Sequence, residues 1–238
     1  MPLQKSEYSV TNTAPQPKTQ PSLDSLISLV DADMKRVNQV IIDNMHSEVA
    51  LIPQLATHLV AAGGKRMRPM LTLASAQLCG YQGGTSAVDL AACVEFIHTA
   101  TLLHDDVVDG SLKRRGFPSV NSIWKNKVSV LVGDYLFSKS LLTMLNIGDS
   151  KVFGIISRTA ERMSQGELLQ LERSRDYWME EEIYFRLVGD KTGALIAAAC
   201  QLGGLAAEQT EDEVNIMGQF GEKVGIAFQI RDDLLDLL

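Results

Sequence analysis

The sequence predicts an all-α fold, built as one domain of about eight to ten helices around a deep central cavity. Apolar residues recur at steps of three and four along almost the whole chain after residue 21, which is the periodicity of amphipathic helices. Alternating strand patterns are nearly absent, and the runs at 107–108 and 128–132 are too short, or too closely bounded by Gly and Asp, to propose a sheet. The 238 residues include 45% hydrophobic and 21% charged residues, a globular composition that excludes disorder of the whole chain.

The first part of the chain predicts a tail and three helices. Residues 1–21 hold four of the seven prolines and are expected to be a flexible tail, which leaves 22–238 as the folded domain. Apolar residues from 26 to 45 predict one helix, and 49–61 predicts a second that ends before Gly63 and Gly64. Pro69 suits the first turn of a third helix, which should run to Leu78 and stop at Gly80.

The remaining helices are expected over four longer segments. Residues 85–109 are apolar on most faces, which is typical of a buried central helix, and Gly110, Gly116 and Pro118 mark the loop after it. Helical patterns follow at 119–146, 150–174 and 177–202, with a possible break at Gly189. The last helix should begin near Thr210 with a capping box and still be running at residue 238.

Charge and composition exclude several classes of protein. The formal net charge is −7, which argues against nucleic-acid binding but not against phosphate ligands held through a divalent metal. The three cysteines are far apart, which excludes a disulfide framework or a zinc ribbon. No signal peptide is visible, and the longest weakly polar stretch, 194–207, is too short to span a membrane. We therefore expect a soluble, cytoplasmic protein.

Two acidic motifs of the form D-D-x-x-D, at 105–109 and 232–236, have apolar residues at their x positions. On a helix the first and last aspartates of each motif share a face, and their repulsion destabilises the helix unless cations bind. One such motif could simply be a solvated helix end. Two motifs, each after an apolar stretch, favour a pair of Mg²⁺ sites that face each other across a cavity and share a diphosphate.

Basic residues occur near both acidic motifs. Gly63 and Gly64 precede three cations within four residues, Arg114 and Arg115 follow the first motif, and Lys191 and Thr192 lie within a long helical segment. Taken singly, each cation could be a solvated surface charge. Taken together, they could supply the phosphate contacts that aspartates cannot make. The glycine segment lacks the spacing of a P-loop, so nucleotide binding is not predicted.

These motifs resemble those of the trans-isoprenyl diphosphate synthases. The string E-F-I-H-T-A-T-L-L-H-D-D-V-V-D at 95–109 resembles their first aspartate-rich motif, and Q-I-R-D-D-L-L-D at 229–236 their second. G-G-K-R-M-R-P at 63–69 is similar to their homoallylic diphosphate site, and Lys191-Thr192 to their lysine-threonine pair. The resemblance spans about residues 25–238, and it is strongest to the medium- and long-chain branch that makes ubiquinone side-chain precursors.

The resemblance implies a Mg²⁺-dependent prenyltransferase that extends an allylic diphosphate, such as farnesyl diphosphate, with isopentenyl diphosphate. It further implies a homodimer, three Mg²⁺ ions per active site and transfer of an amphipathic product at a membrane surface. Asp105, Asp109 and Asp232 would bind Mg²⁺, with Asp106, Asp233 and Asp236 as supporting carboxylates. Arg114, Lys191, Thr192 and Gln229 would hold the allylic diphosphate, and Lys65, Arg68, His98 and Arg115 the isopentenyl diphosphate. Without the resemblance, His98 would be interpreted as a core histidine because its neighbours are apolar.

The helix that carries the first motif also bears on product length. Val94, Ile97, Thr101 and Asp105 fall on one stripe, and each helical turn rises about 5.4 Å, comparable to one isoprene unit. Ala100 and Thr101 stand where a large aromatic residue would close the tunnel after two or three units. We therefore expect a product longer than C20, with C40–C50 favoured, although ordinary helix packing would explain the same stripe and a plug could lie deeper.

Two departures from the family pattern are visible. Residue 110 is Gly where relatives often carry an acid, and the chain ends two residues after Asp236, so the domain is expected to lack the C-terminal helices of its relatives. The alternatives are a shorter-chain (C15–C20) synthase, a non-catalytic subunit that binds prenyl diphosphates, and a terpene cyclase. The second set of cations argues against the cyclase, which binds only one diphosphate.

Overall fold

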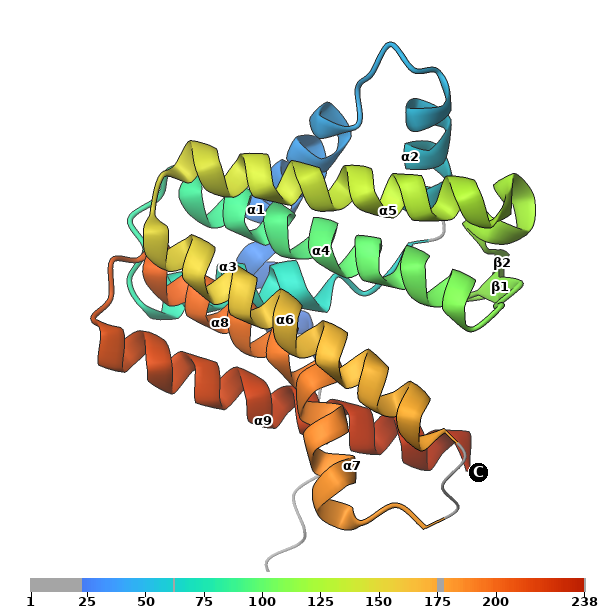
Figure 1. Cartoon of the computed structure of the whole chain (residues 1–238). Helices are drawn as coiled ribbons and strands as arrows, with labels where there is room; N and C mark the ends of the chain where they lie inside the picture. The colour runs from blue at the N-terminus through green and yellow to red at the C-terminus, as the bar shows by residue number, and fades with distance from the viewer. Residues whose placement is uncertain (1–22, 62, 175–177, 238) are drawn as a thin grey trace, which may run out of the picture.

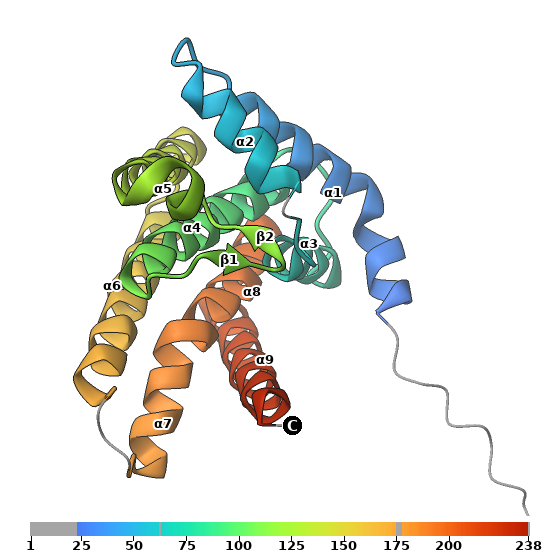
Figure 2. The same ribbon diagram turned by 90° about the vertical axis from the view of Figure 1, so that its right-hand side faces the viewer.

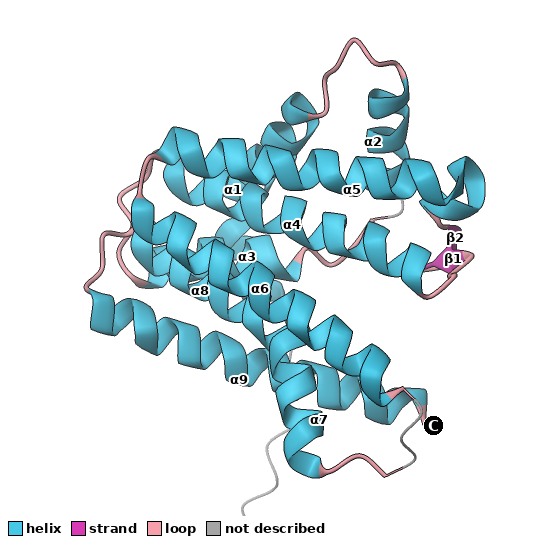
Figure 3. Ribbon diagram, viewed as in Figure 1, coloured by secondary structure: helices cyan, strands magenta, loops and turns pink. Residues whose placement is uncertain are grey.

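The computed structural model describes residues 23–61, 63–174 and 178–237, and these are almost entirely helical (Figures 1 and 3). The predicted tail at 1–21 lies outside the described residues. In chain order the elements are α1 (Asp24–Asn44), α2 (Leu51–Ala61), α3 (Met67–Leu78), α4 (Ser86–Val108), β1 (Lys113–Arg114), β2 (Phe117–Pro118), α5 (Val120–Ile147), α6 (Ser150–Arg173), α7 (Glu181–Val188), the π-helix η1 (Gly189–Gly193), α8 (Ala194–Ala206) and α9 (Glu211–Asp236).

Helix α4 is the centre of the fold, as the sequence predicts. It packs against α1, α3, α5 and α8, and the ribbon shows it surrounded by these helices (Figures 1 and 2). Its side chains from Ala87 to Ile97 are nearly all buried, which explains why an apolar pattern covers most of its faces. The second layer is formed by α8, which packs on α3 and α9. The all-α prediction is confirmed.

Local sequence signals set several helix ends. Thr210 accepts a hydrogen bond from the backbone N–H of Glu213, whose side chain accepts one from the Thr210 N–H, so the predicted capping box is present at the start of α9. Pro69 lies in the first turn of α3, as predicted. Gly148 ends α5 in the left-handed conformation, with φ of 75°, which a residue without a side chain adopts at low cost.

The possible break at Gly189 is present as the π-helix η1, which separates α7 from α8. Three local predictions were wrong. Residues 178–180 are not helical and α7 begins at Glu181, while Leu237 already lies in the turn after α9. The loop after α4 forms a small antiparallel hairpin, in which Lys113 pairs with Pro118. The strands were missed because they are two residues long, too short for an alternating pattern.

Two described helices are long and apolar enough to cross a membrane, so 194–207 is not the longest apolar stretch. They are α4 and α5, and 67% and 33%, respectively, of their most apolar windows are buried inside the protein. For α4, the central position in the core explains the composition. The α5 window instead leaves apolar side chains such as Leu131, Leu142 and Leu145 on the surface, exposed by 58%, 52% and 73%.

Candidate active site in the central cavity

A cavity of about 1220 Å³ is enclosed by α3, α4, α6, η1, α8 and α9, with further residues from the hairpin and α5. This exceeds the roughly 300–1,000 Å³ of pockets for drug-sized ligands. Part of its wall is apolar, with Leu71, Ile97, Phe137, Met163 and Ile196 among the lining residues. The cavity can therefore hold a long hydrocarbon chain away from water.

The two acidic motifs meet at this cavity, although they are more than a hundred residues apart in the sequence. Asp105 and Asp109 at the end of α4 line it, and so does Asp232 near the end of α9. Asp106, Asp233 and Asp236 do not line it. Metal binding by these six aspartates stays a prediction.

Asp105 lies in an environment that disfavours its charge. Its pKa is raised to about 6, mainly by burial and then by repulsion from Glu167, with a smaller contribution from Asp109. Lys191 and Arg114 act in the opposite direction. A carboxylate that is desolvated and repelled by its neighbours gains by binding a cation.

Lys191 lines the cavity, and its side chain is held by two residues of α6. Its ammonium donates to Gln170 Oε1 at 2.9 Å and pairs with Glu167 Oε1 at 2.8 Å. Next to it, the Thr192 hydroxyl donates to Gln229 Oε1 at 2.9 Å, which joins η1 to α9. Glu167 and Gln170 were not predictable, because nothing in their local sequence pattern shows that they face a lysine about twenty residues further on.

A second set of cations lies at the start of α3 and on the hairpin. Arg68 Nη1 donates to His98 Nε2 at 3.0 Å, and Arg68 Nε is buried without a hydrogen-bond partner among the described residues. Because an arginine can only donate, His98 accepts at Nε2 and is neutral. Burial, and then the positive charge of Arg68, Arg115 and other arginines, holds the pKa of His98 well below its usual value. An anion placed here would meet concentrated positive charge.

Two of the supporting aspartates already have protein partners. Asp106 is buried, and its Oδ1 accepts from Arg114 Nε at 2.8 Å and Nη2 at 2.6 Å, which ties the hairpin to α4. Asp233 accepts from the hydroxyl of Tyr184 at 2.6 Å and from Gln229 Nε2 at 2.8 Å. The bond to Asp233, together with burial, raises the pKa of Tyr184 to about 12. Both carboxylates therefore position cavity residues, and Tyr184 was not predicted.

The predicted chain-length residues lie along one wall. Ile97, Ala100 and Thr101 on α4 line the cavity below Asp105. Val94, which precedes them on the same stripe, is completely buried and packs in the core instead. Between Ile97 and Asp105, α4 carries no Phe, Tyr or Trp side chain.

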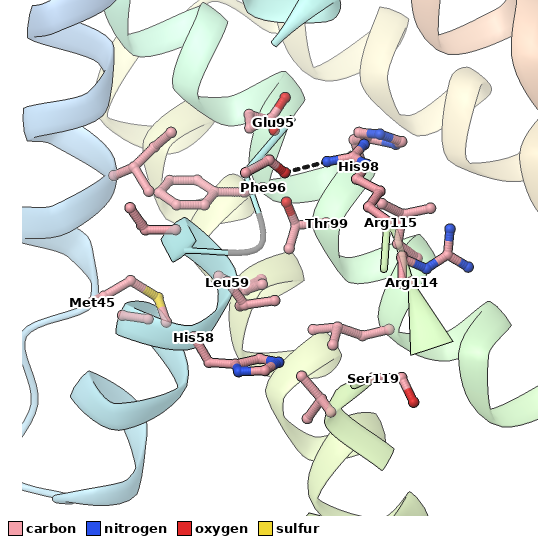
Figure 4. Close-up of a pocket in the computed structure, with 18 of the residues that line it drawn as sticks. Met45, His58, Leu59, Glu95, Phe96, His98, Thr99, Arg114, Arg115 and Ser119 are labelled. Atoms are coloured by element: carbon pink, nitrogen blue, oxygen red, sulfur yellow. Dashed lines mark hydrogen bonds between the residues drawn. The ribbon is translucent and has the colours of Figure 1, made fainter. Parts of the chain in front are cut away.

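A second cavity, of about 100 Å³, lies between α2, α4 and the hairpin (Figure 4). Met45, Leu59 and Phe96 give it an apolar wall, while His98 and Arg115 belong to the large cavity as well (Figure 4). A small apolar space thus adjoins the second set of cations.

The donor set of the large cavity fits Mg²⁺. Aspartate oxygens from α4 and α9 are the hard ligands that this ion prefers, and it usually binds through one or two carboxylates together with substrate phosphates. The described residues contain no group of three His, Cys, Asp or Glu side chains that could hold a metal by themselves.

Comparison with known proteins shows that this chain is similar to members of one enzyme family. The model of the polyprenyl synthetase family matches residues 49–238. The octaprenyl diphosphate synthase of Escherichia coli (strain K12) is 42% identical over 215 residues, which cover 90% of this chain and 66% of that protein. The nonaprenyl diphosphate synthase of Mycobacterium tuberculosis is 38% identical over 87% of this chain and 62% of its own length. The chain thus spans less than two thirds of these relatives.

Solved structures of similar sequence have the same fold. A decaprenyl diphosphate synthase from Rhodobacter capsulatus superposes with a TM-score of 0.87 at 50% identity, covering 90% of this chain and 66% of that one. A polyprenyl synthase from Caulobacter crescentus, complexed with calcium and isoprenyl diphosphate, gives 0.88 at 45% identity, over 92% and 67%.

Proposed function

This chain belongs to the polyprenyl synthetase family, and we propose that it is a Mg²⁺-dependent prenyltransferase that condenses isopentenyl diphosphate with an allylic diphosphate. The observation that carries the proposal is the meeting of both acidic motifs in one large, partly apolar cavity. Carboxylates alone would not hold diphosphates, but cationic side chains line the same cavity. They include one on η1 and, as a second group, those at the start of α3 and on the hairpin. The relatives named as octaprenyl and nonaprenyl diphosphate synthases support this reaction class.

Two diphosphates can be accommodated separately. Lys191 and Gln229 lie with Asp105 and Asp232, where the allylic diphosphate would bind together with Mg²⁺. Lys65, Arg68, His98 and Arg115 form the other group, suited to isopentenyl diphosphate. A cyclase needs only one diphosphate site, so the second group favours a condensing enzyme.

The reaction needs stabilisation of the departing diphosphate and exclusion of water, and residues that line the cavity can supply both. Asp105, Asp109 and Asp232 would hold Mg²⁺, which supplies electrostatic stabilisation to the departing diphosphate, and Lys191 adds positive charge on the same side. As the allylic carbon–oxygen bond breaks, the double bond of isopentenyl diphosphate attacks the allylic carbon and a proton leaves, which the departing diphosphate accepts. Apolar walls keep water from the cationic intermediate.

We infer a long product, C40–C50, for quinone side chains. The reasons are the volume of the cavity and the small residues Ala100 and Thr101 on its α4 wall. Relatives named for octaprenyl, nonaprenyl and decaprenyl products are in agreement.

We further propose a homodimer formed through α5, whose outward residues are apolar and exposed. Large exposed apolar patches on a protein surface mark interaction sites. A cytoplasmic location and contact with a membrane surface during product release stay predictions.

The test is to incubate the purified chain with farnesyl diphosphate, isopentenyl diphosphate and Mg²⁺ and to chromatograph the products. Linear polyprenyl diphosphates of eight to ten units, lost when EDTA is added or when Asp105→Asn is introduced, are expected. Cyclic hydrocarbons would overturn the proposal in favour of a cyclase.

A second candidate is a subunit that requires a partner. It is favoured by a 36% identical relative named heptaprenyl diphosphate synthase component 2 from Geobacillus stearothermophilus. Binding of prenyl diphosphates without any product from the isolated chain would support it.

A further inference from the structure

The π-helix η1 directs three consecutive polar side chains to three different partners. Asp190 pairs with Arg162 of α6, Lys191 with Glu167, also of α6, and Thr192 with Gln229 of α9. A π-helical turn contains an extra residue, so neighbouring side chains are spread differently from those of an α-helix, and such turns occur frequently at functional sites. The direction of Lys191 therefore depends on what holds Asp190 and Thr192.

Arg162 connects three elements through one guanidinium group. Its Nε donates to Asp190 Oδ1 at 2.8 Å, and its Nη2 donates to Glu222 Oε1 of α9 at 2.6 Å. The Asp190 side chain is only 13% exposed, and its other oxygen is 3.8 Å from Arg186 Nε, too far for a hydrogen bond. Arg162 thus makes the shorter of the two ionic contacts of the mostly buried Asp190 carboxylate. Neither Arg162 nor Asp190 lines the cavity.

Glycines bring the neighbouring helices into contact with η1 at the same level. A Cβ atom at Gly166, one turn after Arg162, would lie 3.0 Å from the backbone nitrogen of Lys191. On the opposite side, a Cβ atom at Gly225 would lie 2.7 Å from Gly193 Cα. The backbone of η1 is therefore fixed between α6 and α9, and the Arg162 bridge joins the same two helices beside it.

We propose that Arg162 is a positioning residue, which sets the direction of Lys191 and Thr192 by anchoring Asp190 to α6 and α9. The inference rests on the proposed function, since Lys191 matters only if the cavity binds an allylic diphosphate. Loss of the guanidinium leaves Asp190 with only the longer contact to Arg186 and breaks its connection to α6 and α9, so η1 then shifts or loosens. The allylic site is affected, whereas Arg68 and His98, which belong to the other cation set, are not.

The kinetic test compares Arg162→Ala with Arg158→Ala, an exposed arginine one turn earlier on α6. We expect Arg162→Ala to raise the KM for the allylic diphosphate about tenfold, which corresponds to the loss of one charge-assisted hydrogen bond from Lys191 to the diphosphate. The KM for isopentenyl diphosphate should not change. Arg162→Lys should recover part of this loss, and Arg158→Ala should match the wild type. An equal rise in both KM values, or no rise, overturns the proposal.

A double-mutant cycle tests whether Arg162 acts through Lys191. If it does, adding Arg162→Ala to Lys191→Ala has little further effect on the allylic KM. Fully additive effects would contradict the proposal.

A measurement without catalysis separates this inference from the proposed function. Amide hydrogen exchange at residues 188–194, with and without Mg²⁺ and inorganic pyrophosphate, should be faster in Arg162→Ala and wild-type-like in Arg158→Ala. If Arg162→Ala does not fold, Asp190→Asn, which keeps the shape of the side chain, takes its place. Amide exchange at residues 188–194 is expected to be faster in that variant too. Wild-type exchange in the folded variant overturns the inference, whether or not the wild-type chain makes polyprenyl products.

Discussion

Asp105 combines three destabilising features: burial, a second carboxylate one turn away at Asp109, and Glu167 across the cavity. In the metal-free protein the folded state therefore holds the Asp105 proton up to about pH 6, whereas an unfolded chain releases it near 3.8. The folded state binds more protons between these values, so this group lowers the free energy of unfolding as the pH rises from 4 to 6. The cost is fully present above pH 6.

Asp105→Asn should accordingly stabilise the metal-free protein at pH 8 and have little effect at pH 4. After allowance for solvent screening of this partly exposed group, we expect a gain of about 1 kcal/mol, or a few degrees in Tm. Calorimetry in EDTA at both pH values measures it. The same variant should lose prenyl transfer, and equal Tm shifts at both pH values would contradict the assigned cause.

Single residues could be predicted from the sequence where they belong to a motif. The side chains that hydrogen-bond to these motif residues could not. The acidic motifs could be recognised from their spacing, and Lys191 and Arg68 from the family resemblance. The structure places Lys191, Arg68 and three of the motif aspartates at one cavity. Glu167 and Tyr184 contact Lys191 and Asp233, which are 24 and 49 positions away in the sequence, and Arg162 contacts Asp190, which is 28 positions away. Such contacts arise from helix packing, which local patterns do not encode.

Close packing between α3 and α8 depends on one glycine. A Cβ atom at Gly203 would lie 2.4 Å from the carbonyl oxygen of Thr72 and 2.8 Å from the backbone nitrogen of Ala76. These are backbone atoms of α3, so the contact cannot be relieved by a side-chain rotation. The next residue, Gly204, has its closest neighbour, a Val214 methyl group, at 3.4 Å.

Gly203→Ala should therefore destabilise the protein and Gly204→Ala should not. Overpacking costs about 1–3 kcal/mol or more, which outweighs the gain of about 1 kcal/mol for alanine in a helix. We expect Tm to fall by several degrees for Gly203→Ala, and to stay level or rise for its neighbour. Thermal unfolding followed by circular dichroism distinguishes them, and similar values for the pair would refute the packing argument.

The α4 wall makes a prediction about product length. A phenylalanine at Thr101, about one helical turn below Asp105, or at the adjacent Ala100 would project into the path of the growing chain. Both variants should stop at products of C20 or shorter, as measured by chromatography of the dephosphorylated alcohols. Ala100 is 2% exposed, so Thr101→Phe is the variant less prone to misfold.

Unchanged product length in both folded variants would show that α4 does not form the tunnel floor. Phe137 of α5, which lines the same cavity, would then be the next candidate, and Phe137→Ala should lengthen the product.

Helices were predictable where apolar periodicity was long and uninterrupted, as in α6, or where a long segment was apolar on most faces, as in α4. The capping box fixed the start of α9. The π-helix was predictable only as a possible break, because its sequence Gly-Asp-Lys-Thr-Gly interrupts the apolar pattern without indicating a π-helical turn. Lys125 has φ of 74° and kinks α5, and nothing in its neighbours indicates this left-handed conformation. Such departures are imposed by contacts between elements.

On the surface of the whole molecule, the outward face of α5 carries exposed apolar side chains that no other described element covers. Leu131, Leu142 and Leu145 recur at helical spacing there and are all more than half exposed. Leaving such a face in water costs roughly 25 cal/mol per Å² that could be buried. In a two-fold dimer the same face of a second copy can cover it, since such an interface is self-complementary.

The pair Leu142→Glu and Leu145→Glu should therefore convert a dimer to a monomer. Each substitution enters a two-fold interface twice, so four carboxylates would be buried near one another without partners, a cost that opposes association strongly. Light scattering after gel filtration should give twice 26.1 kDa for the wild type and 26.1 kDa for the variant at the same concentration. Leu78→Glu, at a residue 79% exposed at the end of α3, serves as the control and should keep the wild-type mass. A variant that remains dimeric, or a wild type that is already monomeric, would exclude this face of α5 as the interface.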